Sequence, residues 1–461
     1  MTPEQKPEIR IQLFPEPLEI GETEGFSEKD LLGRRELGDR LTSLVSSVVD
    51  PQVIALNGQW GSGKTTFLKM WAGELRQKGF PVVYFDAFEN DYVEDAFGAL
   101  ARELVMLAES APGNKKATVK SLKEKAVGLG SHLLRSGTKL GAKVGAKVLT
   151  AGIVSDDDLK EILQQAIEGS ADAAEQYMEQ LLDHPKKQKS LADSFRASLS
   201  SLPAALALPQ EGEEQRPLIY IIDELDRCRP DFALSILERI KHFLSVKNVY
   251  FVLGVHQEQL ENSVRYAYGP DIDASNYLNK FITLSISFDL VRRPRKDYLA
   301  LYADFLQRTI RVAEEDRRAL ELTNEFVLRI CRQNGYTLRP LERIFGNISL
   351  AFALGGQRTL KLGPIIGGLC VLKVVQSRLF TKAKKGTLVL EDIAPLFGFT
   401  PRPSPDDHDA SWEYEWWDFC IGKNQDQYQD RANKISFDYN LGSADVVPYI
   451  ANNVVERFAN V

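Results

Sequence analysis

The stretch "VIALNGQWGSGKTTFLKMWAGELRQKG", residues 53–79, decides the fold of this chain. Its first six residues are mostly apolar, as in a short buried strand, and the part from Lys64 onward has the spacing of a helix that ends at Gly79. The turn between them, "GQWGSGKT" at 58–65, matches G-x-x-x-x-G-K-[ST] at every fixed position. A glycine loop placed between a strand and a helix predicts a site that binds phosphate groups.

The residue types in this loop are those that phosphate binding requires. Glycines let successive backbone N–H groups turn toward one anion, and the start of a helix adds the positive end of its dipole. We expect Lys64 to reach the β- and γ-phosphates and the Thr65 hydroxyl to complete the shell of a Mg²⁺ ion. The residues predicted to bind the nucleotide are Gly58, Gly61, Ser62, Gly63, Lys64, Thr65 and Thr66.

The second half of the predicted site is "LIYIIDELDRCRP", residues 218–230, an apolar run followed by a cluster of charges. Asp223 ends the run, at the edge where ligands bind in parallel sheets, and we expect it to hold Mg²⁺ through a bound water. We expect Glu224 to orient and activate the attacking water, which favours a hydrolase. Asp226 and Arg227 have two interpretations: an ion pair that shapes the loop, or a contact with the nucleotide of a neighbouring subunit.

Strand and helix patterns alternate on both sides of a long interruption. Uninterrupted apolar runs suit strands that are covered on both faces, and the alternation predicts a parallel sheet between two layers of helices. The further predicted strands are 81–87, 218–223, 249–255 and 282–288, and the predicted helices of this part include 30–49, 92–110 and 232–246. We therefore predict an α/β fold with a three-layer core and a parallel sheet of the additional-strand type, a helical insertion and a C-terminal helical region.

The patterns divide the chain into six segments. They are an extended N-terminal segment (1–25), two parts of the core (26–110 and 214–296), a helical, partly basic insertion (111–213), a helical region closing on the nucleotide (297–400) and an acidic, Trp-rich C-terminal segment (401–461).

Composition excludes several classes of protein. The 461 residues are 44% hydrophobic and 26% charged, as in ordinary soluble proteins, and the net charge of −7 gives no basic field that indicates nucleic acid. The four cysteines never form a CxxC pair, which argues against a zinc site or a disulfide framework and suits a reducing cytoplasm. No signal peptide is evident, and no apolar stretch approaches the ~18 residues of a membrane span. We expect a cytoplasmic protein.

The insertion contains "SGTKLGAKVGAKVLTAG", residues 136–152, in which glycines, apolar residues and lysines each recur every four positions. This pattern predicts an amphipathic helix, and four interpretations stand. They are peripheral contact of 126–150 with an anionic membrane, docking on a partner helix, a local phosphate-binding patch for nucleic acid, or packing on its own domain. The lack of interleaved aromatic residues argues against a platform for single-stranded nucleic acid. "SWEYEWWDF", residues 411–419, predicts either an interface or a packed cap.

Two motifs together resemble one family. "GQWGSGKTTFL" (58–68) and "IIDELDRCRPDFALSILERIK" (221–241) are similar to the two nucleotide motifs of the KAP P-loop NTPases, and Trp60 fits the Gly-x-Trp-Gly pattern of that family. Weaker similarity extends over 277–288 and 338–350. The resemblance implies a P-loop ATPase core with ATP and Mg²⁺, and it makes Arg339 or Arg343 a candidate second sensor of the γ-phosphate. The predicted catalytic residues are Glu224, Lys64 and Arg339.

Two features depart from the family pattern. His256 stands where the family more often has an aspartate, which puts the γ-phosphate-sensing role of that position in doubt. Many members carry transmembrane helices between the two nucleotide motifs, whereas this chain has an insertion there without a predicted span.

The predicted reaction is ATP + H₂O → ADP + phosphate with Mg²⁺. ATP is favoured over GTP because no N/TKxD motif is apparent, and "DLLGRR" (30–35) is a candidate contact for the adenine. The resemblance implies a nucleotide-driven switch or assembly in bacterial anti-phage defence, acting as a homo-oligomer or with a separate effector protein. The alternative is a slow-turnover, nucleotide-controlled scaffold or signalling adaptor at the membrane periphery.

Overall fold

The computed structural model describes residues 18–48, 50–93, 95–110, 116–137, 171–206, 216–241, 246–288, 297–308, 310, 312, 314–354, 359–399, 412–422 and 426–456. The chain forms two compact units. One, here called the sheet unit, consists of Glu19–Gln59 and Lys64–Asp289. The other, here called the helical unit, consists of Met1–Leu18, Trp60–Gly63 and Leu290–Val461. The tip of the glycine loop therefore groups with the helical unit.

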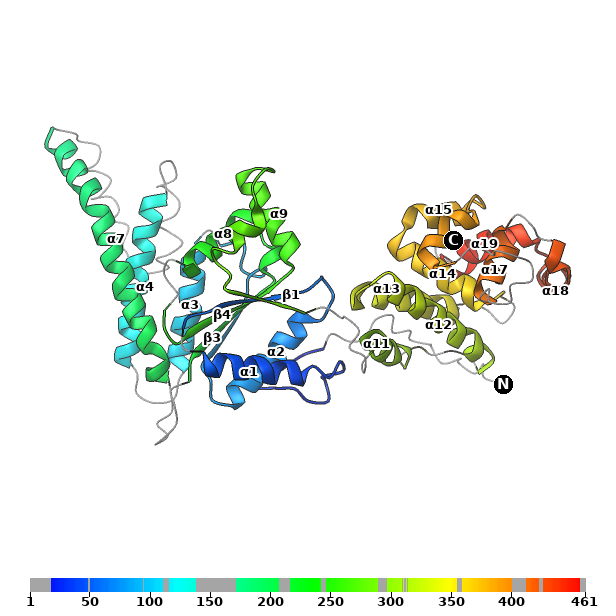
Figure 1. Ribbon diagram of the computed structural model, residues 1–461, viewed down its shortest axis with the longest axis horizontal. Coiled ribbons are helices and arrows are strands. Elements are labelled where there is room, and N and C mark those ends of the chain that lie inside the picture. Colours follow the sequence, from blue (N-terminus) through cyan, green and yellow to red (C-terminus); the bar gives the residue numbers. More distant parts are fainter. Residues whose placement is uncertain are drawn as a thin grey trace, which may run out of the picture. The chain divides into compact units, whose positions relative to one another are not determined.

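The sheet unit is built on a five-stranded parallel sheet with the order β2-β3-β4-β1-β5. The strands β3, β4 and β1 are labelled in Figure 1. Its strands are β1 (Val53–Asn57), β2 (Val82–Asp86), β3 (Leu218–Asp223), β4 (Val249–Val255) and β5 (Leu284–Ser287). The predicted strands are confirmed. β4 separates the strand of the glycine loop from the strand that ends in Asp223, so the additional-strand arrangement is confirmed as well.

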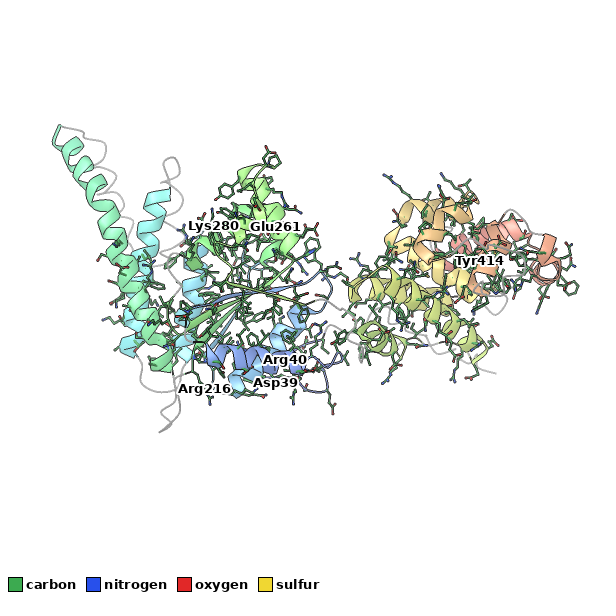
Figure 2. The ribbon with its side chains drawn as sticks, in the orientation of Figure 1. Asp39, Arg40, Arg216, Glu261, Lys280 and Tyr414 are labelled. Atoms are coloured by element: carbon green, nitrogen blue, oxygen red, sulfur yellow. The ribbon has the colours of Figure 1, made fainter. Side chains whose placement is uncertain are left out.

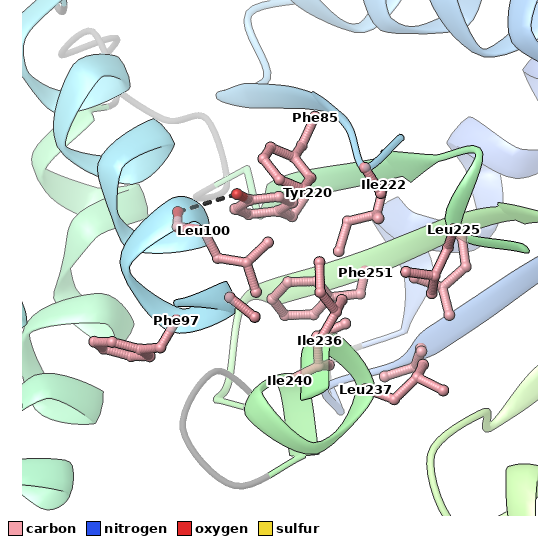
Figure 3. Close-up of a cluster of buried hydrophobic side chains, with 14 of the residues drawn as sticks. Phe85, Phe97, Leu100, Tyr220, Ile222, Leu225, Ile236, Leu237, Ile240 and Phe251 are labelled. Atoms are coloured by element: carbon pink, nitrogen blue, oxygen red, sulfur yellow. Dashed lines mark hydrogen bonds between the residues drawn. The ribbon is translucent and has the colours of Figure 1, made fainter. Parts of the chain in front are cut away.

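The strands are apolar throughout because both faces of the sheet are covered. Along β1, Val53 and Ala55 belong to one buried cluster, whereas Ile54 and Leu56 belong to another. β3 and β4 alternate in the same way, since successive side chains of a strand point to opposite faces. Figure 3 shows the first cluster, in which the hydroxyl of Tyr220 donates to the carbonyl of Leu100 at 3.0 Å.

Helices form the two outer layers. α1 (Arg35–Ser47) and α2 (Lys64–Gln77) cover one face, and the indole N–H of Trp71 in α2 donates to the hydroxyl of Thr42 in α1 at 3.0 Å. The opposite face is covered by α3 (Ala96–Ser110), α8 (Pro230–Arg239) and α9 (Gln257–Tyr268), with the short α10 (Ala274–Leu278) after them.

The first helix starts later than the apolar spacing predicts. Residues 30–34 form a turn in which both carboxylate oxygens of Asp30 accept hydrogen bonds from the backbone N–H groups of Arg34 and Arg35. Side-chain capping of this kind satisfies N–H groups that have no partner at a helix start, so the helix begins at Arg35.

Among the described residues of the insertion are the helices α4 (Lys116–Gly137) and α7 (Ala171–Leu206), which pack together and continue the layer of α3 (Figure 1). Ala126 and Leu129 of α4 are buried, and Phe97 of α3 makes an edge-on contact with Phe195 of α7 at 5.2 Å. The start of the range 126–150 thus packs on its own unit. Residues 138–150, which hold most of the repeated glycines and lysines, lie outside the described residues, so all four interpretations of that pattern stay predictions.

The helical unit contains nine labelled helices within the described ranges. They are α11 (Tyr298–Gln307), α12 (Arg317–Gln333), α13 (Leu338–Leu354), α14 (Gly363–Val375), α15 (Ser377–Lys384), α16 (Leu390–Phe397), α17 (Trp412–Ile421), α18 (Gln429–Tyr439) and α19 (Ser443–Ile450). Trp417 of α17 is fully buried against Phe397, and Tyr414, which is labelled in Figure 2, lies edge-on to Phe399. The packed-cap interpretation of the Trp-rich segment therefore holds for these side chains.

Two further features of the described residues concern membrane spans and cysteines. No helix among them is both long and apolar enough to cross a membrane. All four cysteines are buried thiols.

Gly73 in α2 provides a test of the packing between α2 and the segment before α1. A Cβ at Gly73 would overlap the backbone of Glu24, whereas a Cβ at Gly128 in α4 would meet only Leu191, at 3.5 Å. Alanine is the better helix former by up to about 1 kcal/mol at both positions. We expect Gly73→Ala to lower the free energy of unfolding by about 1–3 kcal/mol, because overlap with backbone outweighs helix propensity. Gly128→Ala is the matched control and should not destabilise the protein in urea unfolding followed by circular dichroism. Equal effects of the two substitutions would contradict the packing.

Candidate nucleotide-binding site

The predicted site residues of the sheet unit meet at one edge of the sheet. Because the strands are parallel, the glycine loop after β1, Glu224 after β3 and His256 after β4 all lie at the carboxyl edge, where such sheets bind ligands. The backbone N–H of Gly58 donates to the carbonyl of Val255 at 3.0 Å, which joins the start of the loop to the end of β4.

The backbone conformation of the loop is the one that its glycines predict. Gly61 and Gly63 have φ of +78° and +88°, in the left-handed region that favours glycine. The hydroxyl of Ser62 is buried and makes no hydrogen bond with any part of the chain that the structure describes. Because buried polar groups are usually paired, an unpaired hydroxyl in this loop fits a ligand that supplies the partner.

The side chain of Lys64 lies under the loop. Its ammonium donates to the carbonyl oxygens of Gly58 and Gln59. Burial lowers the pKa of Lys64, and the carboxylates of Asp226 and Asp223 act in the opposite direction. The ammonium is therefore held at the loop that is predicted to bind phosphate, between backbone carbonyls and acidic side chains.

Asp223 is 1% exposed, and two neutral groups donate to its carboxylate. Oδ1 accepts from the backbone N–H of Glu224 at 2.9 Å, and Oδ2 accepts from the Tyr84 hydroxyl at 2.8 Å. Burial raises the pKa of Asp223, while these two bonds and the neighbouring Thr65 hydroxyl lower it. Burial also raises the pKa of the Tyr84 hydroxyl, and the neighbouring Asp223 raises it further, so this hydroxyl stays a donor.

Gly254 of β4 makes room for this carboxylate. It lies directly opposite Asp223 in the pairing of β3 with β4. A Cβ at Gly254 would overlap Oδ1 of Asp223 and would lie 2.6 Å from Cδ1 of Leu68. The position of the carboxylate therefore depends on a residue without a side chain on the neighbouring strand.

Glu224 has a different environment from its neighbour. Its φ of +59° lies in the left-handed region, and its carboxylate forms an ion pair with Arg227 at 2.7 Å. The Thr65 hydroxyl donates to the same carboxylate at 3.4 Å. Burial raises the pKa of Glu224 and Arg227 lowers it. Arg227 thus forms an ion pair within the chain, with Glu224, and its predicted contact with the nucleotide of a neighbouring subunit stays a prediction.

The residues of the sheet unit fit a Mg²⁺ ion. The Thr65 hydroxyl and the Asp223 carboxylate are oxygen ligands, which this hard cation prefers, and the two side chains are neighbours in the structure. Burial raises the pKa of two adjacent carboxylates here, so a bound cation would stabilise their charged forms.

Arg339 is placed beside the tip of the loop, within the helical unit. The Thr337 hydroxyl donates to the carbonyl of Trp60 at 2.9 Å, and the Leu338 N–H donates to the carbonyl of Gly61 at 3.1 Å. A Cβ on Gly61 would lie 2.5 Å from the Cβ of Arg339. Arg343 follows one turn later in α13.

The other predicted residues are also accounted for. Thr66 lies half-buried in the first turn of α2. The side chain of His256 is 18% exposed, and its Nε2 lies 3.8 Å from Oε2 of Glu258. The thiol of Cys228 is buried, which agrees with a packing role.

Sequence reasoning missed two residues of this site, Tyr84 and Gly254. Tyr84 belongs to an apolar run that predicted only a strand, and tyrosine is common in strands. Gly254 carried a usable signal, because a glycine inside an apolar strand often marks a close approach of another group.

Comparison with models of protein families matches residues 38–353 to the KAP family P-loop domain. The chain belongs to the KAP family of P-loop NTPases. The match spans both nucleotide motifs, so the resemblance drawn from those motifs is confirmed, as is the α/β fold with its parallel sheet.

Among solved structures, the KAP chain is similar to the ORC2 protein of Aeropyrum pernix. Its structure in ADPNP–ADP complexes matches with 12% identity and a TM-score of 0.34, covering 93% of this chain and 95% of that one. Its ADP form matches with 12% identity and a TM-score of 0.32, covering 98% and 97%. No curated protein matches the chain.

Gly254→Ala tests the packing around Asp223. The new Cβ would overlap Oδ1 of Asp223, so we expect the free energy of unfolding to fall by about 1–3 kcal/mol. In the background Asp223→Ala the overlap with Oδ1 is absent. Gly254→Ala should therefore lower the free energy of unfolding by a smaller amount in that background. A double-mutant cycle in urea measures this coupling. Equal costs in the two backgrounds would show that the glycine does not make room for the carboxylate.

Proposed function

We propose that this KAP family member binds ATP with Mg²⁺ and hydrolyses it to ADP and phosphate. The observation that carries the proposal is the convergence of Thr65 with Asp223 and Glu224. The Thr65 hydroxyl donates to Glu224, which is 159 positions away in the sequence, and lies beside the Asp223 carboxylate. A phosphate loop joined to a tandem pair of acids is the arrangement that phosphoryl transfer to water needs.

The proposed binding step uses the loop and Lys64. The start of α2, with the positive end of its dipole, faces the phosphates. Lys64 exchanges its two carbonyl partners for phosphate oxygens, which are stronger acceptors for an ammonium. When bound, Mg²⁺ supplies positive charge at the phosphate oxygens, and Thr65 and Asp223 are the residues that would hold it.

The proposed chemical step uses Glu224. A water oxygen bonds to the γ-phosphorus while the bond from this phosphorus to the β–γ bridging oxygen breaks, and Glu224 accepts the proton of the water. Burial raises the pKa of Glu224, as suits a proton acceptor, and the ion pair with Arg227, which lowers this pKa, supports the role by orienting the carboxylate.

The proposal also assigns a role to Arg339 and a preference for the base of the nucleotide. The position of Arg339 beside Gly61 supports a role as a positive charge near the nucleotide phosphates. ATP is preferred as the substrate because the sequence contains no recognisable guanine-reading motif.

Two substitutions test the assignment. We expect Lys64→Ala to weaken ATP binding by about 10- to 100-fold, since a hydrogen-bonded charge is lost. We expect Glu224→Gln to bind ATP but to hydrolyse it about 100-fold or more slowly, since the proton acceptor is lost. The measurements are the dissociation constant of ATP and the steady-state rate of phosphate release. Lys120→Ala and Glu36→Gln change exposed side chains of the same types and serve as controls. Wild-type turnover in both site variants would refute the assignment.

We further propose that the ATPase drives a conformational switch or assembly. The supporting observation is that the loop tip, Trp60–Gly63, accepts hydrogen bonds from Thr337 and Leu338 at the start of α13. A change in the loop on nucleotide binding would act on these two bonds. From the family resemblance we add that the switch serves bacterial anti-phage defence, as a homo-oligomer or with a separate effector protein.

Nucleotide-dependent assembly is the observable consequence. We expect Glu224→Gln to form a larger species with ATP than without it in size-exclusion chromatography, because the ATP state persists when hydrolysis is slow. Lys64→Ala should remain small under both conditions and should fail to protect bacterial cells in a phage-plating assay. A monomer in every nucleotide state would contradict the assembly proposal.

A further inference from the structure

Tyr84 lies on β2, and its hydroxyl reaches the carboxylate of Asp223 on the neighbouring strand. The two residues are 139 positions apart, and the distance from Oη to Oδ2 is 2.8 Å. Asp86, two residues after Tyr84, is the direct partner of Asp223 in the pairing of β2 with β3. Residues two apart on a strand share a face. The side chain of Tyr84 therefore lies on the same face of the sheet as Asp86, two residues further from the carboxyl edge.

The Asp223 carboxylate is confined from both neighbouring strands. On the β2 side, Tyr84 holds Oδ2, and on the β4 side Gly254 leaves the space that Oδ1 occupies. The N–H of Glu224 holds Oδ1 at 2.9 Å. Rotation of the carboxylate would break at least one of these hydrogen bonds, so the orientation of both oxygens is fixed.

The partners of the two adjacent carboxylates differ in charge. Glu224 pairs with the guanidinium of Arg227, whereas the Tyr84 hydroxyl and a backbone N–H are neutral donors to Asp223. A neutral donor orients a carboxylate without adding a positive charge beside it. A lysine or arginine in the place of Tyr84 would instead repel a bound cation.

We propose that Tyr84 is a positioning residue whose hydroxyl fixes the Asp223 carboxylate and thereby sets the affinity of the nucleotide site for Mg²⁺. The inference rests on the proposed function, because it assigns to Asp223 the role of the metal carboxylate. Partners that orient a metal ligand typically change metal affinity by about 10- to 100-fold when they are removed.

The test measures ADP binding to the full-length protein by calorimetry, first in EDTA and then over a series of Mg²⁺ concentrations. Tyr84→Phe removes only the hydroxyl. We expect this variant to need about 10-fold more Mg²⁺ than the wild type for the same gain in ADP affinity. Its ADP affinity in EDTA should equal that of the wild type, because the phosphate loop is unchanged.

Tyr220→Phe is the matched control. It removes a buried hydroxyl from β3 whose bond goes to the carbonyl of Leu100, away from the site (Figure 3). A loss of stability alone would affect both variants. The Mg²⁺ midpoint, which is the Mg²⁺ concentration that gives half of the gain in ADP affinity, should shift only in Tyr84→Phe. In the background Asp223→Asn, Tyr84→Phe should give no further shift of the midpoint, because the group that Tyr84 positions is already changed.

Each outcome decides the question. An unchanged Mg²⁺ midpoint in Tyr84→Phe, or an equal loss of ADP affinity in EDTA and in Mg²⁺, overturns the inference and leaves the proposed function standing. A further shift in the Asp223→Asn background also overturns it, because Tyr84 would then act through another group. A wild-type protein that fails to bind ADP overturns the proposed function and this inference with it.

Discussion

The buried carboxylate of Asp223 sets the constraint on which the rest of the site depends. A charge that is 1% exposed is costly unless hydrogen bonds or a cation stabilise it. The groups that do so come from three directions: Tyr84 from β2, Thr65 from the first turn of α2, and the N–H of Glu224. Gly254 on β4 contributes by having no side chain. One acidic residue thus ties together the central strands and the helix that follows the phosphate loop.

The order of the strands makes this arrangement possible. β3 lies between β2 and β4, so one side of Asp223 has a tyrosine and the other a glycine. The alternation of side chains places Ile219 and Ile221 in the cluster beneath α2, and Asp223 follows in the same phase. A shift of one residue in the register of β3 would turn Asp223 to the opposite face, away from Thr65. The apolar packing that fixes the register therefore also fixes the face of the sheet on which the Asp223 carboxylate lies.

The two adjacent acids have different surroundings. Neutral donors hold the carboxylate of Asp223. Glu224, in a left-handed backbone conformation, turns its carboxylate to Arg227 and Thr65 instead. The 3₁₀ turn Leu225–Arg227 brings Arg227 back to Glu224 within three residues. Two members of the charge cluster after β3 therefore form an ion pair with each other.

The sequence by itself determined the local parts of this protein. A glycine loop between a strand and a helix, and an apolar strand that ends in Asp223 and Glu224, predicted the α/β fold, the candidate site and the KAP family, because these signals lie within short stretches of the chain. Only the tertiary structure decided that Tyr84 and Gly254 belong to the site and that Arg227 pairs with Glu224. The contacts of Tyr84 and Gly254 depend on strand order and register, which join residues far apart in the sequence. The Arg227 contact depends on the direction of a side chain in a turn, which the apolar pattern does not encode.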